Sequence, residues 1–302
     1  MQFNYSYYDR STPGGTFMKA TLRGTEIYFD IAGMQLAPTR KNDFELRPTL
    51  FMLHGGPGGD HLRFKQHSLE LQDVAQLVFI DHRGCGRSKK TKAKDYTLEN
   101  NIEDIEALRK HLGLEKICIL GTSYGGIVAQ GYAIRYPKRV EKLILVATAS
   151  SFHFLDEAKK YLATHGSKEQ IACAKSLWDG SFKNEKQLLH FFQIMDSFYC
   201  MKAKKNKKAL TRSKTTWSYE ALNQGFSTFL KAFNFIPRLK KINCPTLILA
   251  GDKDWICAAS QSKIIAKHIS QAKIKIFKNC GHAIAVDAHQ DYIKTIQKFL
   301  KS

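Results

Sequence analysis

Four short apolar runs constrain the fold of this chain more than any other feature of its sequence. They span residues 50–53, 77–80, 117–120 and 143–146. The first three run directly into loops that contain glycine, and helical patterns lie between the runs. A strand without alternating polar residues is buried on both faces, as the strands of parallel sheets are. We therefore expect an α/β fold, with a mostly parallel sheet flanked by helices.

The strand pattern is interrupted in the second half of the chain. Between residues 150 and 237 no apolar run ends in glycine, and the segment is rich in phenylalanine. Strand patterns return at residues 246–250 and 274–277, and a helical pattern follows them. We therefore predict one core formed by residues 1–149 and 238–302, with residues 150–237 as a mostly helical insertion.

Residues 121–125 match G-x-S-x-G, a candidate nucleophile motif. The pattern follows an apolar strand and precedes a helical stretch, which is the context that the motif requires. A sharp turn from strand to helix would present the Ser123 hydroxyl at the end of the sheet, with small neighbours that allow close packing. The five-residue pattern alone fits an ordinary glycine-rich turn equally well, so the rest of the chain has to decide between the two.

A serine hydroxyl needs a base within hydrogen-bond reach and a third group that orients the base. His282 follows the last predicted strand, and Asp252 and Asp254 follow the strand before it. The order serine, aspartate, histidine, each just beyond a strand, is typical of hydrolases with this topology. We predict that Ser123 is the nucleophile and His282 the base. Asp254 is the favoured orienting acid, and Asp252 is the alternative.

Acyl transfer also needs hydrogen-bond donors for the oxygen that becomes negative in the transition state. The backbone N–H groups of Tyr124 and Gly56 are the candidates for this oxyanion hole. The first follows the nucleophile, and the second lies in the glycine-rich loop after the first apolar run. A phosphate-binding loop would instead require Gly-Lys followed by Ser or Thr, whereas Gly59 precedes Asp60, an anion that would repel phosphate.

Three sequence blocks together resemble the signature of the proline iminopeptidase family of α/β-hydrolases. They are residues 54–59 (HGGPGG), 81–88 (DHRGCGRS) and 121–126 (GTSYGG). The resemblance implies an α/β-hydrolase core with a helical cap over the active site and no cofactor. It also implies a serine peptidase that releases N-terminal residues, preferentially proline, from peptides. It covers the core from about residue 19 onwards, while the insertion matches only in position and general character.

The insertion departs from the family pattern in its acidic residues. Members of the family hold the substrate's free amino terminus with glutamates of the cap, but residues 223–226 read NQGF near one expected position. A cationic amine in a mostly dry pocket needs a charge partner. The acids of the insertion are Asp156, Glu157, Glu169, Asp179, Glu185, Asp196 and Glu220. The alternative function is therefore a carboxylesterase or lipase-like hydrolase that acts on small esters with the same triad.

The chain is strongly basic, with 47 lysines and arginines against 27 acids and a formal net charge of +20. One segment without acids holds the densest cluster of cations: Lys202, Lys204, Lys205, Lys207, Lys208, Arg212 and Lys214. Such a run is usually a solvated loop, and an anion-facing patch is the alternative. Because no nucleic-acid motif accompanies it, we expect a small peptide or ester as partner and no nucleic acid.

The seven cysteines are an odd number, widely spread, and we interpret them as reduced thiols. The absence of CxxC and HExxH patterns argues against a metal site. No run of 18 apolar residues could form a membrane-spanning helix. The first ten residues lack the features of a secretory signal, so we expect a cytoplasmic protein.

Overall fold

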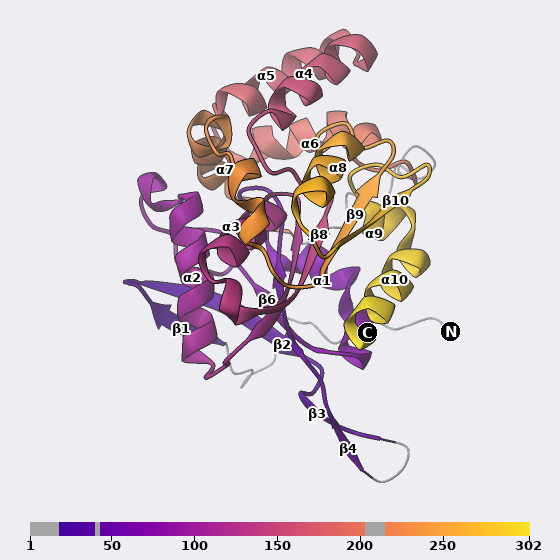
Figure 1. The fold of residues 1–302 in the computed structure, drawn as a ribbon. Helices are drawn as coiled ribbons and strands as arrows, with labels where there is room; N and C mark the ends of the chain where they lie inside the picture. The colour runs from indigo at the N-terminus through magenta and orange to yellow at the C-terminus, as the bar shows by residue number, and fades with distance from the viewer. Residues whose placement is uncertain (1–17, 40–42, 203–214) are drawn as a thin grey trace, which may run out of the picture.

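The computed structural model describes residues 18–39, 43–202 and 215–302, and its centre is an eight-stranded sheet (Figure 1). The first pairs in the sheet order, β1 with β2 and β2 with β6, are antiparallel, and all other pairs are parallel. The mostly parallel sheet expected from the sequence is therefore confirmed. In sheet order the strands are β1 (Lys19–Leu22), β2 (Thr25–Ala32), β6 (Gln76–Ile80), β5 (Thr49–Leu53), β7 (Ile117–Thr122), β8 (Val140–Val146), β9 (Thr246–Gly251) and β10 (Ala272–Phe277).

The central strands are apolar throughout because both of their faces are covered. Every residue of β5 is buried, and its side chains alternate between two hydrophobic clusters. Phe51 and Leu53 belong to the cluster that includes α2 (Leu98–His111) and α3 (Tyr124–Arg135). Leu50 and Met52 belong to the other, which includes α10 (His289–Lys301). Figure 1 shows α2 and α3 on one side of the sheet and α10 on the other.

Between β8 and β9 the described chain forms helices and contributes no strand to the sheet. An isolated bridge between Ser151 and Asn234 joins the two ends of this segment. In Figure 1 it forms the upper part of the molecule, beyond one edge of the sheet. Its helices are α4 (Phe154–His165), α5 (Lys168–Asp179), α6 (Glu185–Tyr199), α7 (Tyr219–Ser227), η5 (Phe229–Lys231) and η6 (Ile236–Lys241). Apart from Lys202, the predicted basic run lies outside the described residues.

Shorter elements complete the described fold. A separate two-stranded sheet, formed by β3 and β4, projects from the lower end of the molecule in Figure 1. The remaining elements are β3 (Leu36–Pro38), β4 (Phe44–Leu46), α1 (His61–Gln66), η1 (Leu69–Asp73), η2 (Ala93–Asp95), η3 (Pro137–Arg139), α8 (Ala259–His268) and α9 (Ile284–Asp287). Because β5, β7, β9 and β10 are parallel, the loops after them meet at one edge of the sheet.

Two glycines allow β5, β7 and α3 to pack at van der Waals distance around Ser123. A Cβ on Gly121 would lie 2.3 Å from the carbonyl oxygen of Gly125. A Cβ on Gly125 would lie 2.2 Å from the carbonyl oxygen of Leu53 and 2.6 Å from that of His54. All three distances are too short for any side chain, so the glycines of the G-x-S-x-G pattern are required by backbone packing.

We predict that Gly125→Ala destabilises the fold by about 3 kcal/mol or more, because the backbone of the central strand has to shift. Gly24→Ala is the comparison: no atom lies within 4 Å of its added Cβ, although its φ is +77°. That left-handed conformation alone should cost about 1–2 kcal/mol. Urea unfolding of both variants measures the difference, and equal losses would contradict the packing argument.

Candidate active site

Ser123 lies at the turn between β7 and α3, in a backbone conformation that non-glycine residues rarely adopt. Its φ is 53° and its ψ is −121°. Its backbone N–H donates to the carbonyl of Val146 at 2.9 Å, and its carbonyl accepts from the N–H of Gly126 at 2.9 Å. The Thr148 hydroxyl donates to the same carbonyl at 2.7 Å. These bonds hold the strained backbone in place while the side chain faces a cavity.

His282 and Asp254 lie on loops that follow the last two strands of the sheet, and their side chains are hydrogen-bonded. The distance from His282 Nδ1 to Asp254 Oδ2 is 2.8 Å. The other carboxylate oxygen, Oδ1, accepts from the backbone N–H groups of Ile256 and Cys257, each at 3.0 Å. The side chain of Asp254 has no exposed surface, so water cannot solvate it. The two backbone N–H groups and His282 supply the hydrogen bonds that water would give an exposed carboxylate.

The alternative acid, Asp252, has a different partner. Its Oδ1 accepts from the backbone N–H of Cys280 at 3.2 Å, and no described contact joins it to His282. The structure therefore brings Asp254, rather than Asp252, together with His282.

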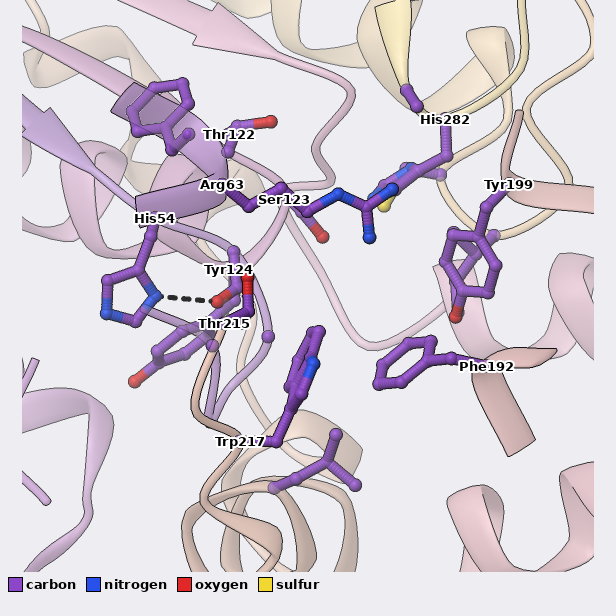
Figure 2. Close-up of a pocket in the computed structure, with 18 of the residues that line it drawn as sticks. His54, Arg63, Thr122, Ser123, Tyr124, Phe192, Tyr199, Thr215, Trp217 and His282 are labelled. Carbon is purple, nitrogen blue, oxygen red and sulfur yellow. Dashed lines mark hydrogen bonds between the residues drawn. The ribbon is translucent and has the colours of Figure 1, made fainter. Parts of the chain in front are cut away.

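Ser123 and His282 line the same cavity, which has a volume of about 210 Å³. Figure 2 shows both side chains at its wall, with Tyr199 beside His282 and with Phe192 and Trp217 across the cavity from Ser123. Tyr199 packs edge-on against the His282 ring, with centroids 5.6 Å apart. The aromatic residues come from α6 and from the segment before α7, so the segment between β8 and β9 closes the space over Ser123.

The two predicted oxyanion-hole residues also line this cavity. Tyr124 is the first residue of α3, and Gly56 lies in the loop after β5 with φ 130°. A Cβ at Gly56 would lie 2.6 Å from the backbone nitrogen of Gly58, so only glycine fits there. Among the described residues, no group accepts a hydrogen bond from the backbone N–H of either residue. Both donors are thus available to a substrate oxygen.

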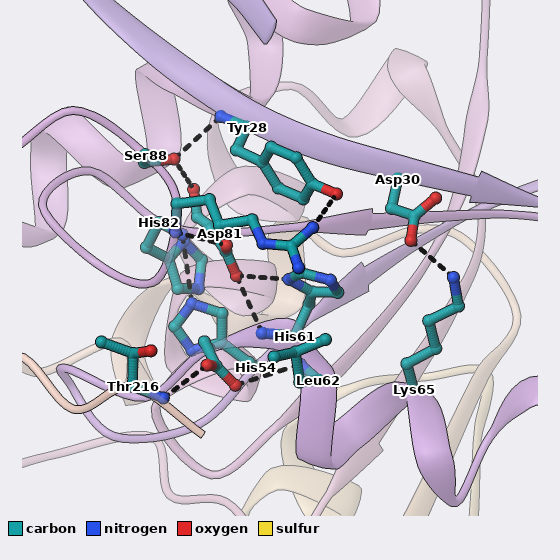
Figure 3. Close-up of polar contacts among 12 residues, drawn as sticks. Tyr28, Asp30, His54, His61, Leu62, Lys65, Asp81, His82, Ser88 and Thr216 are labelled. Atoms are coloured by element: carbon teal, nitrogen blue, oxygen red, sulfur yellow. Dashed lines mark hydrogen bonds and ion pairs between the residues drawn. The ribbon is translucent and has the colours of Figure 1, made fainter. Parts of the chain in front are cut away.

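Two buried residues, His54 and Asp81, connect the glycine-rich loops beneath the cavity (Figure 3). His54 Nδ1 lies 2.8 Å from its neighbour's carbonyl, and His54 Nε2 accepts from the backbone N–H of His82 at 3.1 Å. Burial lowers the pKa of His54, which favours the neutral ring. Asp81 accepts from the backbone N–H groups of His61 and Arg87 at 2.8 and 2.9 Å, and contacts His61 Nδ1 at 2.8 Å. Both residues position the loops; His54 also lines the cavity, whereas Asp81 does not.

Three charged residues that sequence reasoning did not assign to the site also line the cavity: Asp60, Arg63 and Asp196. Asp60 caps α1 by accepting from the backbone N–H of Leu62 at 3.0 Å, and it also accepts from that of Thr216 at 2.7 Å. Burial raises the pKa of Asp60 to about 6. One signal was available for Asp196. It lies four residues after Phe192 and three residues before Tyr199, and this spacing places all three side chains on one face of α6.

The described residues give no sign of a metal site or a membrane span. They contain no group of three or more His, Cys, Asp or Glu side chains arranged to hold a metal ion. Within the same residues, no helix has the length and apolar character needed to cross a membrane. All seven cysteines lie in this part of the chain, and none forms a disulfide.

Comparison with known proteins gives consistent matches. Residues 48–288 match the family model of the alpha/beta hydrolase fold. The chain is 34% identical to proline iminopeptidase PfmaB of Pestalotiopsis fici, across 91% of this chain and 99% of that protein. It is 30% identical to a proline iminopeptidase of Lactobacillus helveticus, across 93% and 96%. The crystal structure of a Mycobacterium smegmatis proline iminopeptidase has a TM-score of 0.73 and 18% identity, across 95% and 98%.

The raised pKa of Asp60 predicts a measurable dependence of stability on pH. The folded protein holds this proton more tightly than the unfolded chain does, so ionisation between about pH 4 and 6 costs stability. At about 1.4 kcal/mol per pKa unit, the free energy of unfolding of Asp60→Asn should rise by roughly 3 kcal/mol relative to that of the parent protein as the pH is raised from 4 to 7. Urea unfolding at both pH values measures this change. Asp179→Asn, at an exposed position, is the control, and a stability difference for Asp60→Asn that does not vary with pH would contradict the prediction.

Proposed function

The chain belongs to the proline iminopeptidase family of α/β-hydrolases, and we propose on that premise that it releases an N-terminal residue, preferentially proline, from peptides. The observation that carries the proposal is the hydrogen bond of 2.8 Å from the buried Asp254 to His282, which lines the same cavity as Ser123. A nucleophile, a base and an orienting acid are the parts that a serine hydrolase needs.

In the proposed mechanism, Ser123 Oγ attacks the carbonyl carbon of the scissile bond. His282 accepts the serine proton at Nε2, because its Nδ1 is bonded to Asp254. Asp254 holds the His282 ring in place and stabilises the imidazolium that forms. The negative oxygen of the tetrahedral intermediate accepts hydrogen bonds from the backbone N–H groups of Tyr124 and Gly56.

The intermediate then collapses, and His282 donates its proton to the leaving amine. The acyl group remains on Ser123 as an ester. A water molecule, deprotonated by His282, attacks this ester and releases the N-terminal residue. Both half-reactions use the same groups, and no step requires a cofactor.

Residues 150–237 serve as the cap in this proposal, and residues 1–149 and 238–302 form the core. The wall that the cap supplies is largely aromatic, with the Phe192 and Trp217 rings 4.2 Å apart between centroids. A prolyl ring is apolar and compact, so an aromatic wall near Ser123 suits it.

Asp196 is the acid of the cap that we assign to the substrate's amino terminus. It lines the cavity, and its Oδ1 is buried without a hydrogen-bond partner among the described residues. Burial raises its pKa, which reflects the cost of an unpaired carboxylate in this position. An ammonium group bound there would satisfy the carboxylate, and Asp196 would take the role that glutamates of the cap have in the family.

The first test compares three substrates: a proline aryl amide with a free amine, its N-acetylated form and a short-chain nitrophenyl ester. We expect cleavage of the free amine form, little or none of the acetylated form, and a loss of at least about 1,000-fold with Ser123→Ala. Initial rates measure all three. A loss of less than about tenfold with Ser123→Ala would refute the mechanism. Ser123-dependent cleavage of the ester alone would favour the alternative, an esterase.

The second test concerns the amine. Asp196→Asn should lower kcat/KM for the free-amine substrate by about 10- to 100-fold, the range for a lost hydrogen bond to a charged group. The ester has no amine, so its hydrolysis should change by far less. Asp156→Asn, an exposed acid on α4 of the same segment, is the matched control. Equal losses on the amine and ester substrates would contradict the assignment of Asp196.

A further inference from the structure

Arg63 is the only lysine or arginine among the described residues that line the cavity. It lies on α1 and lines the same cavity as Ser123, and Figure 2 shows its side chain extending towards the side that holds His282 and Tyr199. Its guanidinium makes no hydrogen bond or ion pair with any described residue. The other charged groups on helix α1 and its N-cap are occupied: Lys65 pairs with Asp30 at 2.5 Å, and Asp60 accepts two backbone hydrogen bonds.

The half-buried guanidinium of Arg63 is available to a ligand. Arginine carries five N–H donors and stays charged in proteins, and no nitrogen of Arg63 is a fully buried atom without a partner, so these donors can be reached from the cavity. Burial lowers the pKa of Arg63, while the charge of Asp196 opposes this shift. His67, which also lines the cavity, has its pKa lowered to about 4 by burial and by the Arg63 charge, so it is neutral at pH 7. A positive charge is therefore kept in the cavity without a hydrogen-bond or ion-pair partner among the described residues.

Arg63 and Asp196 face the same space but form no ion pair with each other. Two opposite charges that share a small cavity without pairing suit the two ends of a zwitterion. Two extended residues span at most about 7 Å, so a dipeptide carries an amine and a carboxylate within a short distance of each other. The cavity volume of about 210 Å³ lies below the roughly 300–1,000 Å³ of pockets for larger ligands, which also favours a short substrate.

We propose that Arg63 binds a carboxylate of the substrate, and that the preferred substrates are dipeptides whose free C-terminal carboxylate reaches Arg63 while their amine meets Asp196. The planar fork of a guanidinium matches a carboxylate with two parallel hydrogen bonds. A phosphate is disfavoured because Asp60 and Asp196 line the same cavity. This inference rests on the proposed peptidase function, since it names the substrate class of that site.

The test compares kcat/KM for prolylglycine with that for its C-terminal amide. We expect the parent protein to prefer the free acid by about 10- to 100-fold, as for a hydrogen bond to a charged group. Arg63→Met should bring this ratio close to one, and Arg63→Lys, which keeps the charge, should retain part of it. Lys116→Met removes one positive charge at an exposed position beside the start of β7, at the other end of that strand from Ser123, and should leave the ratio unchanged.

A second substrate pair separates the possible sources of the carboxylate. The mononitrophenyl ester of succinic acid carries its carboxylate in the acyl part, and nitrophenyl acetate carries none. An Arg63-dependent preference for prolylglycine and not for the succinate ester supports the proposal. The same preference for the succinate ester alone overturns the dipeptide assignment.

Failure of the inference and failure of the proposed function have different signatures. If the parent protein cleaves the acid and the amide equally well, in a Ser123-dependent reaction, the Arg63 proposal is overturned and the peptidase function stands. If no peptide is cleaved while Ser123-dependent ester hydrolysis persists, the peptidase function and the dipeptide assignment are both overturned.

Discussion

The close packing of β5, β7 and α3 is the constraint on which the rest of the site depends. The backbone of Gly125 passes so near the carbonyl of Leu53 that no Cβ fits between them. The chain can turn from strand to helix in this space only if Ser123 takes a positive φ, and hydrogen bonds to its backbone on both sides hold it there. The same turn places Tyr124 in the wall of the cavity. The proposed nucleophile and the proposed oxyanion donor thus have their positions set by one packing contact.

Two buried carboxylates fix the loops around the site by accepting hydrogen bonds from their backbone N–H groups. Asp81 and Asp254 have side chains with no exposed surface, and each accepts two backbone N–H groups and contacts one histidine. A carboxylate buried in this way is stable only when its donors stay in place, so it restricts loops that have no regular secondary structure. Rigid loops allow the groups around Ser123 to be arranged before the substrate binds.

The electrostatics of the cavity differ from those of the whole chain. The net charge of +20 suggests a preference for anions, yet two aspartates and one arginine line the cavity among the described residues. Arg63 comes from the helix after the glycine-rich loop, and Asp196 comes from the segment between β8 and β9. They line the same cavity only because α6 packs over the sheet edge. The charge that matters for recognition is therefore a property of the assembled site.

The sequence by itself determined the sheet, the place of the helical segment and the chain order of Ser123, Asp254 and His282. These depend on local patterns: continuous apolar runs mark buried parallel strands, and polar residues just beyond the strands mark one edge of the sheet. Tertiary structure alone decided that Asp254 contacts His282 while Asp252 binds a loop N–H. It also decided that Arg63 and Asp196 face the cavity. Such choices depend on the directions of side chains from elements distant in sequence, and those directions exist only after the elements have packed together.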